Sequence, residues 1–173
     1  KRAMHDMREG NGGPIIDTCC HIFDLWRMIF DAEPIRVTAR GFTFAKGRPE
    51  LSHIRKLAPD TGALIVEHSS GDLGVMTITW GLPPGLNIRS YTDILGPKGV
   101  IFPGFNQILI RREGEEEKID LVPMDAKAAQ VHYFAKVVSG EAELKVKGEN
   151  GRIALRVSLA ALKSMEKGEP VKI

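Results

Sequence analysis

Apolar and polar residues near the start of the chain recur with a helical period. When the residues of 16–31 are placed about 100° apart around an axis, the apolar side chains gather on one side and the polar ones on the other. The polar side carries Asp17, His21 and Asp24. Pro34 follows, and because the residue before a proline is disfavoured in the α region, the helix should end by about that point. The pattern therefore predicts one amphipathic helix over residues 16–31.

The middle of the chain is rich in β-branched and aromatic residues in alternation, which predicts strands. The expected strands cover residues 35–44, 63–69, 75–80, 88–95, 100–102, 108–112 and 118–122. Turn compositions separate them, and the run SSGD at 69–72 predicts an antiparallel hairpin. The run EEE at 115–117 is expected at a solvated hairpin tip. We therefore expect one antiparallel meander.

The last third of the chain predicts two more helices. One covers residues 127–139 and is stopped by Gly140. The other covers 152–167, and its apolar residues span most of its circumference, so it should be largely buried. Residues 171–173 can add a short final strand, and the polar segment 46–61 is a loop that either covers something or is simply mobile. Helices and strands are segregated along the chain, which indicates an α+β fold.

Composition narrows the class of protein. The chain has 173 residues, 43% of them apolar, which suffices for one domain with a buried core. Basic and acidic residues number 24 and 22 and are interleaved, so nothing indicates a nucleic-acid-binding surface. Charged residues interrupt the most apolar stretch, 15–30, so it cannot cross a bilayer, and the polar start is no signal peptide. The two cysteines are adjacent, which suits neither disulfides nor zinc and leaves a reducing, cytoplasmic setting as the default.

Asp17 and His21 are four residues apart, which places their side chains on one face of a helix, and Asp24 follows three residues later. A carboxylate can hold the orientation of an imidazole and stabilise its protonated form, which a general base for a hydroxyl proton requires. The alternative is that these three residues form the solvated arc of an amphipathic helix. From spacing alone, the alternative is the commoner situation.

The residues around this helix add weaker signals. Gly12 and Gly13 allow close backbone approach, so they could bring the helix start against a ligand or another domain, although glycines before a helix more often mark a turn. His5 lies in the leading loop and either reaches the same polar site or is simply exposed. Cys19 and Cys20 are expected to be buried thiols without a redox or metal role. The sequence has no metal-ligand spacing, no P-loop, and no G-x-G-x-x-G between a strand and a helix.

Residues 12–25 read GGPIIDTCCHIFDL. This run resembles the G-G-x-x-x-D-x-x-x-H-x-x-D-[LI] signature of the Gfo/Idh/MocA oxidoreductases, the family named for glucose-fructose oxidoreductase and inositol 2-dehydrogenase. The likeness continues over residues 62–80, 93–99 and 148–173, and so covers nearly the whole chain. In particular, the run DILGPKG at 93–99 is similar to the family's G-x-x-G turn.

The resemblance implies a two-domain enzyme, with an N-terminal Rossmann domain that binds NAD or NADP. The second domain would be α+β, with a large open, mainly antiparallel sheet and helices packed on one face. Residues 1–173 are similar to this C-terminal domain alone, which agrees with a chain that opens with Lys and lacks the glycine fingerprint. A lysine that the family's first domain supplies to the reaction has no counterpart here.

The resemblance also assigns roles to residues. It places the catalytic acid/base on His21, an assisting carboxylate on Asp17, and a substrate-hydroxyl contact on Asp24. His5 is a further candidate for substrate binding, and Gly12 and Gly13 would line the cleft between the two domains. No metal ligand is expected.

We therefore expect the substrate-binding and oligomerisation domain of an NAD(P)-dependent dehydrogenase that acts on a sugar, polyol or related hydroxy compound, inactive without its own Rossmann domain. A homo-oligomer through the sheet is expected, because residues 75–80 carry large side chains on one alternate face. Neither nucleic acid nor a membrane is expected as a partner. The alternative is a non-enzymatic ligand-sensing or assembly module on the same fold, and the sequence upstream of Lys1 would discriminate between the two.

Overall fold

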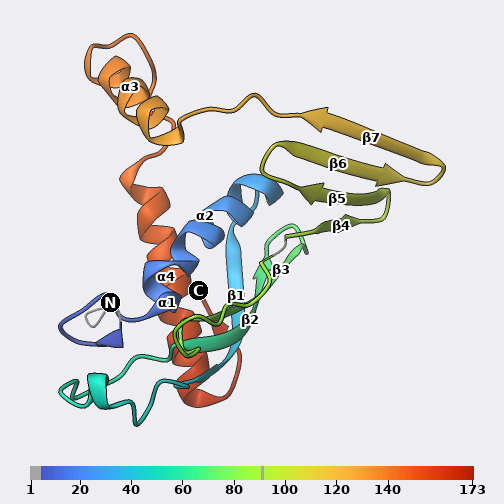
Figure 1. Cartoon of the computed structure of the whole chain (residues 1–173). Coiled ribbons are helices and arrows are strands. Elements are labelled where there is room, and N and C mark those ends of the chain that lie inside the picture. The colour runs from blue at the N-terminus through green and yellow to red at the C-terminus, as the bar shows by residue number, and fades with distance from the viewer. Residues whose placement is uncertain (1–4, 91) are drawn as a thin grey trace. The chain divides into compact units, whose positions relative to one another are not determined.

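The computed structural model describes residues 5–90 and 92–173, and the chain divides into two units (Figure 1). Unit 1 comprises Lys1–Asn87 and Val146–Ile173, and unit 2 comprises Ile88–Lys145. Unit 1 contains the candidate site residues together with a sheet and the helices that cover it. Unit 2 contains a second sheet and one helix.

The sheet of unit 1 has four antiparallel strands in the order β3-β2-β1-β8. Their bounds are Pro34–Phe42 for β1, Thr61–His68 for β2, Leu73–Thr79 for β3 and Val171–Lys172 for β8. β2 and β3 form the hairpin that the run at 69–72 predicts. Burial alternates along β1 and β2, because one face is covered by helices and the other is open.

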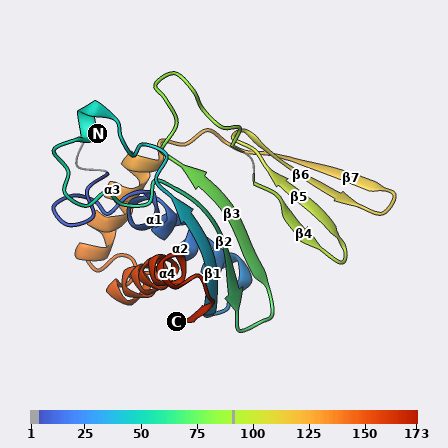
Figure 2. The same ribbon diagram turned by 90° about the horizontal axis from the view of Figure 1, so that it is seen from below.

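Three helices lie on one face of this sheet (Figure 2). They are α1 (Pro14–Asp17), α2 (Cys19–Phe30) and α4 (Gly148–Lys167). α4 packs against β1 and α2, so side chains from both helices and the sheet share one core. The buried residues of this shared core are Ile15, Cys19, Phe23, Val37, Ala39, Leu64, Val66, Val157, Ala160 and Ala161.

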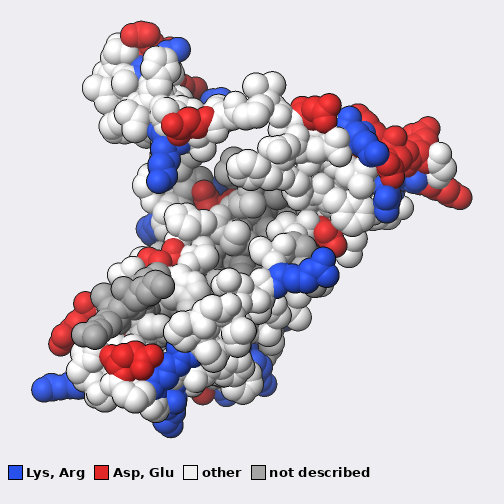
Figure 3. All heavy atoms as spheres, in the orientation of Figure 1, with Lys and Arg blue, Asp and Glu red and all other residues white. Residues whose placement is uncertain are grey.

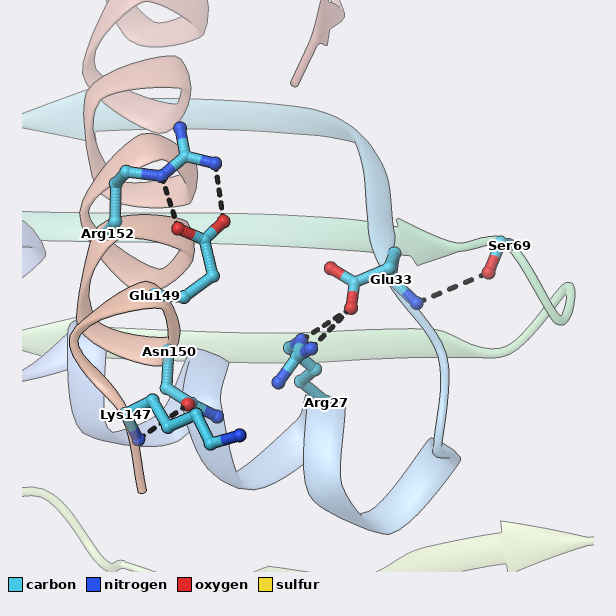
Figure 4. Close-up of polar contacts among 7 residues, drawn as sticks. All are labelled: Arg27, Glu33, Ser69, Lys147, Glu149, Asn150 and Arg152. Carbon is cyan, nitrogen blue, oxygen red and sulfur yellow. Dashed lines mark hydrogen bonds and ion pairs between the residues drawn. The ribbon is translucent and has the colours of Figure 1, made fainter. Parts of the chain in front are cut away.

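α2 is held to the sheet at its C-terminal end. Asp31 adopts a left-handed conformation with φ 45° and ends the helix. Arg27 in the last turn donates to Glu33 over 2.8 Å, and the amide of Glu33 donates to the hydroxyl of Ser69 in the β2–β3 turn (Figure 4). The exit of α2 is therefore fixed against the hairpin.

α4 begins with polar contacts between neighbouring residues. The amide of Lys147 donates to the side-chain oxygen of Asn150 over 3.0 Å, and Arg152 pairs with Glu149 one turn earlier (Figure 4). Gly168 ends the helix in the left-handed region, with φ 74°.

The segment between β1 and β2 is anchored by Asp60, whose side chain is fully buried. The carboxylate accepts hydrogen bonds from the amides of Phe44 and Ala45, over 2.9 and 2.8 Å, and from the hydroxyl of Thr61. A buried charge is tolerated when its oxygens are hydrogen-bonded in this way. The segment contains the short 3₁₀ helix η2 (Pro49–Leu51), in which Leu51 is buried, and most of the residues from 46 to 57 are exposed.

Unit 2 contains a four-stranded antiparallel meander and the helix α3 (Ala126–Val138). The strands are β4 (Ile94–Gly96), β5 (Gly99–Pro103), β6 (Gln107–Arg112) and β7 (Glu115–Asp120). The carboxylate of Asp125 caps α3 by accepting from the amides of Lys127 and Ala128. Charges of both signs lie side by side at the β6–β7 hairpin (Figure 3), where Arg111 pairs with Glu116 across the strands.

The α+β class and the antiparallel pairing are confirmed, but the single meander is wrong. The strands divide into two separate four-stranded sheets, because the prolines and glycine at 83–85 fall in a stretch without strand between β3 and β4. Of the strand expected at 88–95, only Ile94 and Leu95 are in a strand among its described residues. The run at 115–117 is also misplaced, since it lies within β7 and the turn is formed by Glu113 and Gly114.

Two helix expectations also need correction. The helix expected over 16–31 is divided at Thr18, whose amide bonds back to the carbonyl of Pro14 and closes α1. α4 starts at Gly148, and only one of its faces is buried, because its packing partners lie on one side. Leu155 and Leu159 are 44% and 51% exposed. In the part of the chain that the structure describes, no helix combines the length and apolarity that spanning a bilayer requires.

Candidate active site

His21 lies in the first turn of α2, and its side chain is exposed. Asp24 is three residues further along the same helix, so the two side chains share one side of it. Asp17 is the last residue of α1, directly before the break at Thr18. The structure thus places the three candidate residues along one short stretch of unit 1.

The carboxylate of Asp17 is held by Asn11, whose side-chain amide donates to Oδ1 over 2.9 Å. Among the described residues, no hydrogen bond or ion pair joins Asp17 to His21. The two residues belong to different helices, α1 and α2, and Thr18 between them has dihedrals in the αR region. Asp17 therefore takes its orientation from the loop before α1.

Asp24 is half-buried, and its Oδ1 is shielded from solvent. Within the described residues, this oxygen has no hydrogen-bond donor. A shielded carboxylate oxygen without a donor costs free energy, and because the protein covers Oδ1, neighbouring atoms must shift before a ligand hydroxyl can reach it.

The segment before α1 is packed against residues 57–59. The carbonyl of His5 accepts from the amide of Ala58 over 2.8 Å, and the Nδ1 atom of His5 is shielded without a partner among the described residues. Gly12 and Gly13 are both buried and both have positive φ, 73° and 77°. A Cβ on Gly13 would lie 2.8 Å from the Cβ of Ala58, so the space beside this glycine is occupied by the protein itself.

The structure disfavours the thiolate form of both cysteines. Cys19 is fully buried, and burial raises the pKa of its thiol to about 12. Burial also raises the pKa of the half-buried Cys20. The expectation of a buried thiol is confirmed at Cys19. In residues 5–90 and 92–173, no cluster of three or more His, Cys, Asp or Glu side chains is arranged to hold a metal ion.

A hollow of about 250 Å³ lies in unit 1, and charged side chains form most of its wall. Its lining residues are Asp6, Arg8, Glu9, His53, Arg55 and Lys56. His21, Asp17 and Asp24 do not belong to this wall. Of the three candidate residues, His21 is exposed, whereas Asp17 and Asp24 are half-buried.

The described residues do not form a dinucleotide-binding turn. Such a turn needs a strand, a glycine-rich loop and a helix whose N-terminus meets the pyrophosphate. Gly12 and Gly13 follow a loop, and α1 has only four residues. The neighbourhood of Gly13 is filled by Ala58 and Pro59, which leaves no room for a phosphate. NAD or NADP thus does not fit here as a group held by this chain alone.

Asn11 is the site residue that the sequence pattern did not indicate. It lies in an irregular loop, six residues before the carboxylate it contacts. Its only signal is its place directly before Gly12 and Gly13, whose conformations carry the chain back over α1.

A family model described as the GFO/IDH/MocA C-terminal domain matches residues 2–102, which is more than half of the chain. The chain is 28% identical over 173 residues to myo-inositol 2-dehydrogenase of Thermotoga maritima, covering 94% of this chain and 50% of that protein. It is 25% identical over 171 residues to scyllo-inositol 2-dehydrogenase (NAD(+)) of Bacillus subtilis, and the match covers 94% of this chain and 48% of that protein. The chain thus spans about half the length of these curated relatives.

Solved structures share the fold. An oxidoreductase domain protein from Kribbella flavida has a TM-score of 0.80 at 19% identity, with 100% of this chain and 53% of that chain covered. Aldose-aldose oxidoreductase from Caulobacter crescentus, complexed with glycerol, has a TM-score of 0.78 at 19% identity, with 99% and 50% covered. At 19% sequence identity, the structural likeness to these two proteins establishes only that this chain shares their fold.

Proposed function

The chain belongs to the Gfo/Idh/MocA oxidoreductase family, and on this premise we propose that it forms the substrate-binding part of an NAD(P)-dependent dehydrogenase. The substrate would be a sugar, polyol or related hydroxy compound. Two curated relatives are named as inositol 2-dehydrogenases, which supports a cyclic polyol as the first substrate to test.

The observation that carries the proposal is the placement of His21. The imidazole is exposed on α2, and the shielded, donorless oxygen of Asp24 lies one turn away on the same helix. Both residues fall inside the segment that the family model matches. Oxidation of an alcohol requires a general base to remove the hydroxyl proton. A neighbouring group that accepts a hydrogen bond from a substrate hydroxyl can hold the alcohol beside that base.

Each residue has a distinct role in the proposal. Asp24 accepts a hydrogen bond from a substrate hydroxyl and so fixes the reacting carbon near His21. His21 accepts the hydroxyl proton. Asp17, whose carboxylate is held by Asn11, favours the imidazolium through its negative charge rather than through a hydrogen bond. His5 is the further candidate for substrate binding.

The cofactor is assigned to the part of the full-length protein outside this chain. When bound there, NAD or NADP supplies the hydride acceptor. The residues of this chain bind and orient the substrate and remove its proton. Gly12 and Gly13, which are buried, would support the wall of the cleft rather than contact the cofactor.

Residues 1–173 would also serve as the oligomerisation domain. The face of the unit 1 sheet opposite the helices exposes apolar side chains, with Leu73 56% and Val75 66% exposed. Such a face is suited to contact between copies of the chain. We place a dimer or tetramer contact there.

The test is His21→Ala in the full-length protein, assayed with myo-inositol and with NAD⁺ or NADP⁺. Loss of a general base should lower kcat by roughly two to four orders of magnitude. His132→Ala removes an exposed imidazole in unit 2 and is the matched control. A change in kcat under about threefold for His21→Ala would reject the role of His21 as the acid/base. A wild-type protein that binds the polyol without oxidising it would favour the ligand-sensing module.

A further inference from the structure

The loop that precedes α1 is braced internally. The amide of Gly12 donates to the carbonyl of Asp6 over 3.0 Å and closes the loop. The carboxylate of Asp6 accepts from the amides of Arg8 and Glu9, over 2.8 and 3.0 Å. These hydrogen bonds lower the pKa of Asp6, and the bond from the amide of Glu9 has the larger effect. Asp6 also forms a β-bridge with Leu57, so the loop is tied to the neighbouring segment.

Gly12 and Gly13 determine where this loop presents its last side chain. Both residues lie in the left-handed region, with φ 73° and 77°, and a side chain at either position would be strained. A Cβ on Gly12 would lie 2.7 Å from Cδ1 of Ile16, and one on Gly13 would lie 2.8 Å from the Cβ of Ala58. The turn is therefore specific to two glycines, and it brings Asn11 back over α1.

The side-chain amide of Asn11 donates to Oδ1 of Asp17 over 2.9 Å. A hydrogen bond from an amide to a carboxylate is charge-assisted, and it fixes the plane of the carboxylate. Of the hydrogen bonds in the described part of the chain, this is the one that reaches the Asp17 carboxylate.

We propose that Asn11 is a positioning residue that orients the carboxylate of Asp17, and that the Gly12-Gly13 turn exists to place it there. Asn11 acts through Asp17 and is not itself a catalytic residue. The inference rests on the proposed function, because it gives Asn11 a part in the reaction that His21 and Asp17 would perform. The inference thus adds to the proposed reaction a loop residue, Asn11, that precedes the helix carrying His21.

The kinetic test compares Asn11→Ala and Asn11→Asp in the full-length protein, with myo-inositol as substrate. Asn11→Ala should lower kcat by about tenfold, the effect of one hydrogen bond to a charged group, and change KM by less than about twofold. Asn11→Asp should lower kcat further, because a second carboxylate repels that of Asp17. Asn106→Ala, at an exposed asparagine of unit 2, is the control.

A double-mutant cycle with Asp17→Asn separates positioning from a general structural role. In that background, Asn11→Ala should change kcat by less than about twofold, because its partner is already lost. Effects that multiply in the double variant would overturn the proposal, as would an Asn11→Ala enzyme with at least about half of the wild-type kcat.

Crystal structures of the wild-type and Asn11→Ala full-length proteins test the same contact without activity. The carboxylate of Asp17 should leave its wild-type orientation in the variant, while the backbone of α1 and α2 superimposes. An unchanged carboxylate would overturn the proposal. If the wild-type protein oxidises no polyol, the dehydrogenase assignment fails, and the structures alone decide the role of Asn11.

Discussion

The indole ring of Trp26 on α2 lies directly against the backbone of Gly74 in β3. A Cβ at Gly74 would overlap with three ring atoms of Trp26, namely Cε3, Cδ2 and Cζ3. The ring is also packed against Phe23, with centroids 5.9 Å apart, so it has little freedom to move aside. The approach of α2 to the sheet therefore depends on the missing side chain at position 74.

We predict that Gly74→Ala destabilises the protein. Overpacking a tight contact costs about 1–3 kcal/mol, which exceeds the gain of about 0.4–1 kcal/mol from a less flexible unfolded chain. Urea unfolding of the full-length protein measures the difference. Gly96→Ala is the matched control in a strand, because a Cβ at position 96 would have no neighbouring atom within 4 Å. Combining Gly74→Ala with Trp26→Leu should cost less than the sum of the two, and strict additivity would contradict the clash.

Local patterns predicted most elements of the fold but not how the strands associate. Periodicity located α3 and the β2–β3 hairpin, because each depends on residues close together in sequence. The order β3-β2-β1-β8 depends on contacts between distant segments, and β8 pairs with β1 at the opposite end of unit 1's sequence. Such pairings leave no local signature. The division into two sheets could not be predicted for the same reason.

The candidate site was predicted by a resemblance rather than by geometry. The spacing of Asp17 and His21 predicted a pair on one helix, whereas the structure divides the helix at Thr18 and adds a contact from Asn11 to Asp17. The break depends on how α1 closes on Pro14, which a period count does not detect. Asn11 is a common loop residue, so only the three-dimensional path through Gly12 shows its contact.

His68 is a buried imidazole at the end of β2, with 2% of its surface exposed. It packs edge-on against Phe30, with ring centroids 4.8 Å apart and an interplanar angle of 69°. Its Nδ1 atom has no hydrogen-bond partner among the described residues. Burial lowers the pKa of His68 from its ordinary value, an effect larger than the opposing ones of Asp72. The folded protein therefore favours the neutral imidazole.

We predict that His68 makes the protein less stable as the pH falls from about 7 towards 5. In the unfolded chain its pKa is about 6.5, so below that pH the unfolded state binds a proton that the folded state does not. The contribution of His68 to the free energy of unfolding is fully present above pH 6.5. It is lost as the pH falls towards the lower pKa of His68 in the folded protein. Urea unfolding at several pH values should show a steeper loss for wild type than for His68→Leu. The control is His132→Leu, at an exposed histidine, and parallel curves for wild type and His68→Leu would contradict the prediction.

The open face of the unit 1 sheet carries an apolar patch across its strands. Val75 in β3 lies opposite Ile65 in β2, and they are 66% and 39% exposed. Leu73, two residues before Val75 on the same face of β3, extends the patch and is 56% exposed. An exposed apolar face of this kind is typical of surfaces that contact another chain.

We predict that Val75→Lys weakens self-association of the full-length protein, because an uncompensated ammonium at the centre of an apolar contact must lose its hydration. Loss of a central contact costs about 2 kcal/mol or more, which raises the dissociation constant by about thirtyfold or more. Size-exclusion chromatography with light scattering over a range of protein concentrations measures the shift towards monomer. Leu159→Lys, at a half-exposed leucine on the helical side of the sheet, is the control for the same added charge and should leave the oligomer unchanged. A wild-type protein that is monomeric at all concentrations would remove the basis of the prediction, and equal association of wild type and Val75→Lys would show that the contact lies elsewhere.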